Sequence, residues 1–308
     1  MSLSSVIRFC LFSVCLISLL PVTAARAGQV FWSLNSYGPN RQSNGQPLPA
    51  GTGFQLGVFS GGFIPSAGNT AGWAAHWRSW DEIWYDPAEG MFSKEVLFDE
   101  NTAPFTEGTA LYCWGYVLKS NSQAEYFLAT ASTWTVPGTA PETFPVFVDL
   151  ETAGTVILGA AHPGSGTIST ASVQAGTAPP FLFADWRRAH FTPPRRTDST
   201  VSGPEADPDG DGRSNLLEYL TGTPPDAADS RSLLSISAAA GGSLGITFPS
   251  PPSVRAEWEF ETSTNLSEWE PATALPVYDP AAGLWRVSPA MDETRGFLRL
   301  RALAPLGP

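Results

Sequence analysis

Oxygen-bearing side chains recur at the spacing of a calcium loop in residues 207–218, which read DPDGDGRSNLLE. Such a loop supplies side-chain oxygens from positions 1, 3, 5, 9 and 12, a backbone carbonyl from position 7, and a glycine at position 6 for a sharp turn. Gly212 occupies position 6, and the ligand positions are held by Asp207, Asp209, Asp211, Arg213 through its carbonyl, Asn215 and Glu218. We therefore predict a bound Ca²⁺. The alternative is a solvated acidic turn, because Asp, Gly and Pro are ordinary turn residues.

The flanks of the loop indicate a single structural site. Residues 216–220 place leucines on one face of a short helix, which Gly222 can end. Residues 201–206 are polar and contain a proline, so they cannot form the incoming helix of a paired EF-hand. Position 8 is Ser214, which lacks the apolar side chain that would pair with a second loop. We expect the ion to add folding free energy to its surroundings.

The first 27 residues have the pattern of a secretory signal peptide. A positive charge at Arg8 precedes an apolar run over residues 9–20, and Ala25-Arg26-Ala27 forms a small-x-small cleavage site. No later segment approaches the ~20 apolar residues that a transmembrane helix needs. The sequence therefore predicts a secreted, soluble protein that begins near Gly28 and has no membrane span after cleavage. It is expected to be extracellular, released or held at the cell surface.

The net charge limits the classes of binding partner, and the number of cysteines limits the chemistry that a thiol could perform. Without Arg8 and Arg26, 15 of the 17 basic residues remain against 29 acidic ones, a formal charge of −14. Such an acidic chain is not expected to bind nucleic acid or an anionic membrane. Cys10 and Cys15 lie in the leader, which leaves Cys113 alone in an apolar, aromatic run. A lone cysteine in that setting is expected to be a small buried residue and not a nucleophile.

Changes in composition predict a mainly β chain in which two β units are joined by the calcium segment. The expected divisions are a signal peptide over 1–27, an antiparallel β-sandwich over 28–178, a connector over 179–225 and a smaller β domain over 230–304. Short β-branched or aromatic runs between Gly, Pro and Asn mark the strands. They cover residues 29–34, 54–59, 92–98, 110–118, 125–130, 145–150 and 155–158, then 233–237, 244–248, 256–262, 284–287 and 296–301.

Four tryptophans of the first unit are spaced differently from the alternating pattern of a strand. Trp73, Trp77, Trp80 and Trp84 are spaced by four, three and four residues, which predicts one face of a helix lying on the sandwich. Two interpretations are open, namely indoles buried against the sheet or an exposed aromatic platform for sugar rings. A short helix is also expected at residues 183–190 of the connector.

The connector and the C-terminal unit resemble a module of large secreted bacterial proteins, which are often sorted to the cell surface. The residues that carry the resemblance are FADWRRAHFT at 183–192, the loop from Asp207 with NLLEY after it, FETSTNLSEW at 260–269 and GFLRLR at 296–301. In that module a Trp-containing helix precedes a single Asp-rich calcium loop, akin to those of dockerins and thrombospondin type 3 repeats, and a terminal β domain follows. The resemblance implies the same six calcium ligands and an extracellular role with no assigned activity.

No constellation for catalysis stands out. His76, His162 and His190 lack the spacing of a zinc site, and Ser165 lies between glycines without the strand, elbow and helix of a serine nucleophile. We therefore expect a calcium-stabilised structural or interaction protein without enzymatic activity, whose partner is an extracellular polysaccharide or a surface protein. The alternatives are carbohydrate binding by the N-terminal sandwich and a dockerin-like segment that binds another protein.

Overall fold

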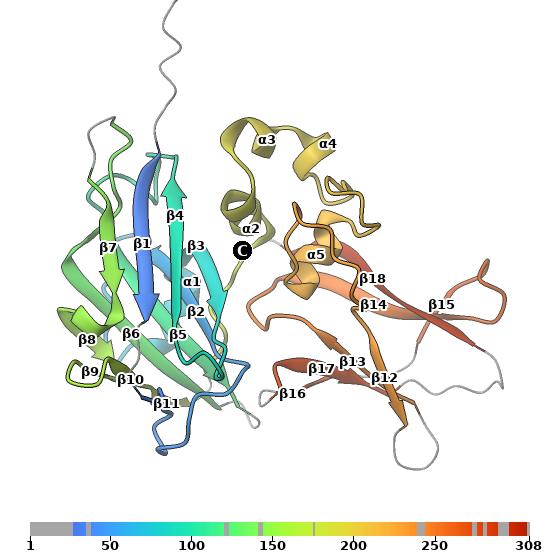
Figure 1. Cartoon of the computed structure of the whole chain (residues 1–308), viewed down its shortest axis with the longest axis horizontal. Helices are drawn as coiled ribbons and strands as arrows, with labels where there is room; N and C mark the ends of the chain where they lie inside the picture. Colours follow the sequence, from blue (N-terminus) through green and yellow to red (C-terminus); the bar gives the residue numbers. More distant parts are fainter. Residues whose placement is uncertain are drawn as a thin grey trace, which may run out of the picture.

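The computed structural model describes residues 27–34, 38–119, 123–140, 144–174, 176–238, 244–272, 276–279, 282–288 and 296–306. The fold is mainly β, with several antiparallel sheets and a few short helices, which confirms the predicted fold class. Two groups of strands are joined by a helical connector (Figure 1). Among the described residues, no helix is long and apolar enough to cross a membrane. The predicted signal peptide lies outside these residues except for its last position.

The N-terminal unit contains two main sheets. The larger has the strand order β11-β6-β5-β2-β3, with β8 on β6, and the smaller has the order β4-β1-β7. Their bounds are β1 (Gly28–Leu34), β2 (Gly53–Phe59), β3 (Trp77–Trp84), β4 (Phe92–Phe98), β5 (Ala110–Leu118), β6 (Gln123–Thr135), β7 (Val146–Asp149), β8 (Thr155–Leu158) and β11 (Ala171–Gln174). A hairpin of β9 (Ala160–His162) and β10 (Thr167–Ser169) lies beside them. The sandwich was predicted to be antiparallel, but β1 pairs with β7 in parallel.

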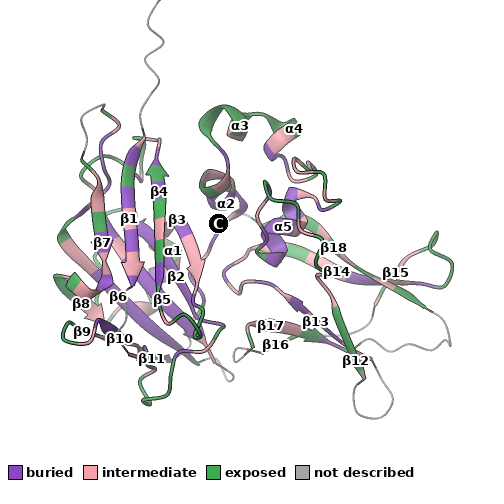
Figure 2. Cartoon of the chain, in the orientation of Figure 1, coloured by how far each residue is buried: buried purple, intermediate pink, exposed green. Residues whose placement is uncertain are grey.

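The core of this unit lies between the two sheets. Alternate residues of β1 point inward, so that Val30, Trp32 and Leu34 pack with Phe54 and Leu56 of β2. Buried segments run along the strands on the facing sides of both sheets (Figure 2). Such alternation is expected of strands with one face in a core.

Cys113 is fully buried in the same core, as predicted. Burial raises the pKa of its thiol, because the thiolate would lose its hydration. The group is therefore not a nucleophile in this fold.

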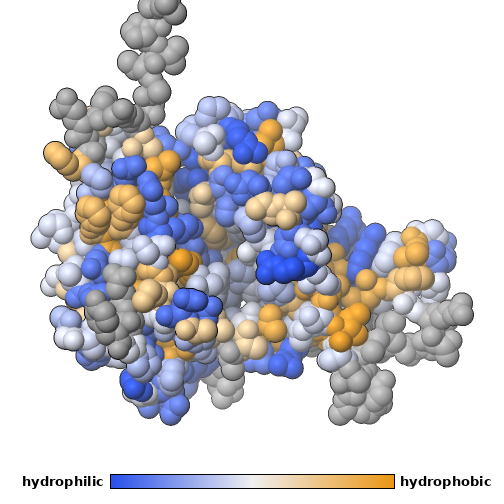
Figure 3. Space-filling model, viewed as in Figure 1, coloured by the Kyte–Doolittle hydropathy of each residue, from blue (hydrophilic) through white to orange (hydrophobic). Residues whose placement is uncertain are grey.

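The outer face of the smaller sheet is partly apolar. Phe31 of β1 stacks on Phe147 of β7 with ring centroids 5.5 Å apart, and Leu97 is exposed beside them on β4. Apolar surface is interspersed with hydrophilic residues on this side of the molecule (Figure 3). The two rings face each other, so they do not present a flat platform to solvent.

The prediction of a tryptophan-rich helix is wrong. The helical part is limited to η1 (Thr70–Gly72) and α1 (Trp73–His76), and Trp77, Trp80 and Trp84 belong to strand β3. A β-bulge interrupts the register of β3 on β2 at Trp80. Trp77 belongs to a cluster on the outer side of the sheet and Trp80 to the inner core, because residues three apart in a strand point to opposite faces. Trp73, Trp77 and Trp80 are at most 2% exposed, which supports the interpretation as core for these three. Trp84 is half-buried, so the four indoles do not form one exposed platform.

The connector consists of short helices. They are α2 (Phe183–His190), which agrees with the predicted helix, α3 (Pro193–Thr197), α4 (Ser199–Ser202) and α5 (Asn215–Thr221); a further single turn, η2 (Leu150–Thr152), belongs to the sandwich. Helix α2 packs on strand β3 of the sandwich, and α5 packs on β18 (Phe297–Pro305) of the C-terminal unit. The guanidinium of Arg188 lies over the rings of Trp80 and Phe105. Arg196 forms ion pairs with Asp99 and Glu100 at the end of β4. These contacts fasten α2 and α3 to the first unit.

The C-terminal unit has two smaller sheets, with the orders β12-β13-β17-β16 and β15-β14-β18. The strands are β12 (Ser235–Ala238), β13 (Leu244–Pro249), β14 (Ala256–Ser263), β15 (Glu270–Pro271), β16 (Val277–Asp279), β17 (Leu284–Val287) and β18 (Phe297–Pro305). The five predicted strands correspond to β12, β13, β14, β17 and β18. Ile246, Phe248, Phe260 and Val287 form its small core.

Candidate metal site

The loop between α4 and α5 is closed at its base by backbone hydrogen bonds. The N–H groups of Asn215 and Leu216 donate to two carbonyls in residues 204–206, at 2.8 and 2.9 Å. Within the loop, Gly210 and Gly212 have φ angles of 75° and 90°, a region in which other residues are strained. The sequence therefore supplies glycine at the two positions where the backbone reverses.

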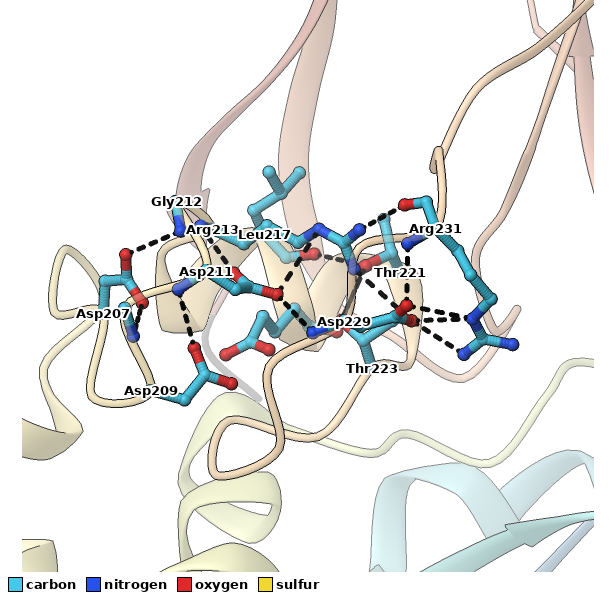
Figure 4. Close-up of polar contacts among 12 residues, drawn as sticks. Asp207, Asp209, Asp211, Gly212, Arg213, Leu217, Thr221, Thr223, Asp229 and Arg231 are labelled. Atoms are coloured by element: carbon cyan, nitrogen blue, oxygen red, sulfur yellow. Dashed lines mark hydrogen bonds and ion pairs between the residues drawn. The ribbon is translucent and has the colours of Figure 1, made fainter.

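Three aspartates converge inside this loop. One carboxylate oxygen from each of Asp207, Asp209 and Asp211 lies within 4.8 Å of the others. The carboxylate of Asp207 accepts hydrogen bonds from the N–H groups of Gly210 and Gly212, each at 2.9 Å (Figure 4). Asp209 and Asp211 each accept from the N–H two residues later, at 3.1 and 2.9 Å. These bonds orient the three side chains toward the interior of the loop.

Buried oxygens without a partner lie next to the aspartates. Neither oxygen of Glu218 accepts a hydrogen bond in the described structure, and the same is true of Asp209 Oδ2 and Asn215 Oδ1. Glu218 and Asn215 are both fully buried. Asn215 Nδ2 donates to the carbonyls of Val201 and Gly203, at 2.9 and 2.8 Å, which fixes the orientation of its amide. Buried polar atoms almost always have partners, so this set of oxygens fits a bound cation.

The charges of the loop also favour a bound cation. Burial, together with the neighbouring carboxylates of Asp209, Asp211 and Asp207, raises the pKa of Glu218 to about 8, against a smaller opposing effect of Arg213. Four carboxyl groups therefore share a small volume. A divalent cation would remove both the repulsion and the lack of partners.

The donor set indicates a hard cation. Carboxylate, amide and carbonyl oxygens suit Ca²⁺ or Mg²⁺, whereas the softer metals prefer nitrogen and sulfur ligands. A site with a buried carboxylate that can bind through both oxygens suits the larger coordination sphere of Ca²⁺. The geometry thus fits a hard divalent ion, and the assignment to calcium is a proposal.

The structure brings together four of the six predicted ligands. Asp207, Asp209 and Asp211 form the cluster, and Glu218 lies close enough for their charges to shift its pKa. Asn215 is buried at the first position of α5, with its free oxygen as described. Arg213 was expected to matter only through its carbonyl, but its side chain is buried and pairs with Asp211 and with Asp229 outside the loop.

A second group of polar residues lies at the seam between the two β units. Glu82 of β3 accepts hydrogen bonds from Gln55 Nε2 and the Tyr116 hydroxyl at Oε1, both at 2.8 Å, and from Ser253 Oγ of the C-terminal unit at 2.9 Å at Oε2. Burial raises the pKa of Glu82 to about 7 despite these donors. Cavities of about 280 and 220 Å³ lie nearby, and both are lined by Asp81, Lys94 and His190.

The three histidines have separate surroundings. His76 stacks on Phe63, His190 packs on Trp186 and His162 Nε2 lies 3.1 Å from Ser169 Oγ. Among the described residues, they join no cluster of metal-binding side chains.

No family model, curated protein sequence or solved structure matches this chain. The resemblance to secreted bacterial proteins with a calcium loop therefore remains a prediction from the residues that carry it.

Proposed function

We propose that this protein is a secreted, calcium-stabilised structural or interaction component without enzymatic activity. It acts outside the cell, either released or held at the surface. Its partner is an extracellular polysaccharide or a surface protein, and its acidic composition disfavours nucleic acid and anionic membranes. The ion at residues 207–218 fastens the connector between the two β units.

One observation carries this proposal. Glu218 is fully buried, neither of its oxygens has a partner among the described residues, and three aspartates face it. An uncompensated buried carboxylate costs several kcal/mol of stability, unless a cation or a proton neutralises it. Ca²⁺ bound by the loop would turn this cost into folding free energy.

The helix after the loop gives the ion a structural target. Leu216 and Tyr219 of α5 pack in a cluster with Phe181 and Trp186 of the connector. The Tyr219 hydroxyl donates to the carbonyl of Phe181 and accepts from the N–H of Arg255 in the C-terminal unit, the latter at 2.8 Å. An ion that fixes the start of α5 would therefore stiffen the junction of both units.

Calorimetric titration with CaCl₂ tests the proposal directly. We expect one Ca²⁺ per chain, with an affinity in the range of extracellular calcium modules, roughly 10⁻⁴–10⁻³ M or tighter. MgCl₂ is expected to bind more weakly, because Mg²⁺ demands a stricter octahedral geometry. Absence of calcium binding, together with an identical thermal melt in calcium and in EDTA, would refute it.

Carbohydrate binding is a second candidate function, and the seam cavities favour it. Their walls combine the apolar side chains of Val96, Leu97 and Pro251 with the polar groups of Lys94 and His190. The rings of Trp80, Trp186 and Tyr219 also line them but are at most 3% exposed. Burial lowers the pKa of His190 to about 4, so the imidazole is neutral and can donate or accept at neutral pH. Such mixed walls suit the apolar faces and hydroxyls of a sugar.

Co-sedimentation with insoluble polysaccharides tests this second candidate. We expect selective binding to at least one polysaccharide and its loss on Lys94→Met, because that substitution removes a polar group shared by both cavities. Phe147→Ser, on the outer face of the smaller sheet, is the matched control. Retention of binding by Lys94→Met, or no binding to any member of the panel, argues against the cavities as the site.

A further inference from the structure

The side chain of Arg213 leaves the metal loop and contacts the chain that follows α5. Its guanidinium is about nine-tenths buried and lies 3.8 Å from Asp211 Oδ2 and 3.6 Å from Asp229 Oδ2. Its Nη2 donates to the carbonyl of Arg231. We call residues 226–231 the strap, because Asp229 of this segment contacts Asp211 and Arg213 of the loop before the chain enters the C-terminal unit (Figure 4).

Asp211 also joins the loop to the strap. Its Oδ1 accepts from the N–H of Arg213 inside the loop, and its Oδ2 accepts from the N–H of Asp229 at 3.0 Å. One predicted metal ligand therefore holds a backbone group of the strap directly. Whatever fixes the carboxylate of Asp211 also fixes the position of Asp229.

The strap has its own ion pair, which keeps Asp229 in place. Asp229 accepts hydrogen bonds from the N–H and the guanidinium of Arg231, at 2.7 to 3.0 Å. These bonds hold the Asp229 carboxylate where its Oδ2 lies 3.6 Å from Arg213 Nη1. Arg213 thus lies between two carboxylates, one from the loop and one from the strap.

We infer that Arg213 is a positioning residue that ties the cation loop to the strap, so that occupancy of the loop and docking of the strap are coupled. The inference rests on the proposed function, because it requires a cation at the loop. Coupling of two binding events is reciprocal. Calcium therefore stabilises the docked strap, and loosening the strap weakens calcium binding.

The sign of the effect separates positioning from simple electrostatics. A guanidinium close to a cation site repels the cation, so removing that charge would tighten calcium binding if charge alone mattered. A positioning role has the opposite consequence, because loss of the guanidinium would loosen the strap, whose Asp229 N–H holds Asp211 Oδ2 in place. Removal of the Arg213 guanidinium therefore tightens calcium binding if only its charge matters, and weakens calcium binding if Arg213 is a positioning residue.

The test combines calcium affinity with proteolysis of the strap. We expect Arg213→Met to raise the dissociation constant for calcium about tenfold. Arg213→Lys should raise it by a smaller factor, because an ammonium group keeps the charge but not the planar, forked geometry of the guanidinium. Calcium should slow tryptic cleavage after Arg231 about tenfold in the unsubstituted protein, scored by mass spectrometry of the fragments. At a calcium concentration that saturates each variant, Arg213→Met should lose most of this protection.

Arg286→Met is the matched control, since Arg286 forms an exposed ion pair with Asp279 on neighbouring strands of the C-terminal unit. It removes one positive charge and should leave both readouts unchanged. Unaltered or tighter calcium binding by both Arg213 variants, with Arg231 still protected, would overturn the inference while leaving the proposed function intact. If Arg213→Met does not fold, Arg213→Lys carries the test alone. An unsubstituted protein that binds no calcium overturns the proposed function as well.

Discussion

Glu218→Gln is expected to destabilise the protein in calcium and to stabilise it in EDTA. In calcium the substitution removes a buried carboxylate ligand, so a protein saturated at 100 times its dissociation constant would lose up to about 2.7 kcal/mol. At roughly 2–4 °C per kcal/mol, this corresponds to a melting temperature lower by about 5–10 °C. In EDTA it removes the carboxylate that lacks partners and is repelled by three aspartates, a gain of roughly 1–3 kcal/mol.

Thermal melts of the unsubstituted protein and of Glu218→Gln, in excess CaCl₂ and in EDTA at one pH, measure this reversal of the order of stability. Glu205→Gln is the matched control, because Glu205 is an exposed acid of the same connector and its substitution changes the charge equally. It should move the melting temperature little in either condition. Asp209→Ala combined with Glu218→Ala should abolish the dependence on calcium. Equal shifts of Glu218→Gln in both conditions would contradict a cation at the loop.

Glu82→Gln is expected to make the protein more stable above pH 7 and to leave its stability near pH 4.5 almost unchanged. Burial raises the pKa of Glu82 from 4.5 to about 7, so between these values the folded chain holds a proton that the unfolded chain has released. This stabilising contribution is complete below pH 4.5, falls as the pH rises to 7, and is then lost. The difference amounts to at most about 3 kcal/mol, and the remaining solvent contact of the side chain reduces it.

Glutamine can replace the protonated acid at this position. Its Oε1 can accept from Gln55 and Tyr116, and its Nε2 can donate to Ser253 Oγ, so the three hydrogen bonds of the seam are retained. Urea unfolding of both proteins at several pH values between 4.5 and 8 gives the difference curve, in which all other titrating groups cancel. Glu257→Gln, at an exposed position of β14, should give a flat curve. A flat curve for Glu82→Gln would mean that Glu82 ionises normally.

Most strands and the clustering of the aspartates in the loop could be predicted because their signals are local. The ligands of the loop lie within twelve residues, and the two glycines that reverse its backbone lie among them. The predicted runs at residues 284–287 and 244–248 reproduce β17 and nearly all of β13. The strands that were missed include β9, β10 and β15, which have only two or three residues and so offer no periodicity.

The tryptophan segment shows where local pattern fails. A spacing of four, three and four residues predicts a helix only if one face is buried. In β3 both faces are covered, Trp77 on the outer side and Trp80 in the core, and a bulge shifts the register between them. Burial on both faces removes the alternation that identifies a strand, so the residues at 77–84 could not be told from a helix.

The sequence by itself determined the mainly β character and, within residues 207–218, the cluster of aspartates and the glycines that reverse the backbone, since each depends on residues close together in the chain. Only the tertiary structure decided which distant groups meet. Asp211 contacts Asp229 across eighteen residues, and Glu82 contacts Ser253 across 171. Such pairs depend on how the loop, the strap and the two β units pack, because that packing determines which charges lose water and which partners replace it.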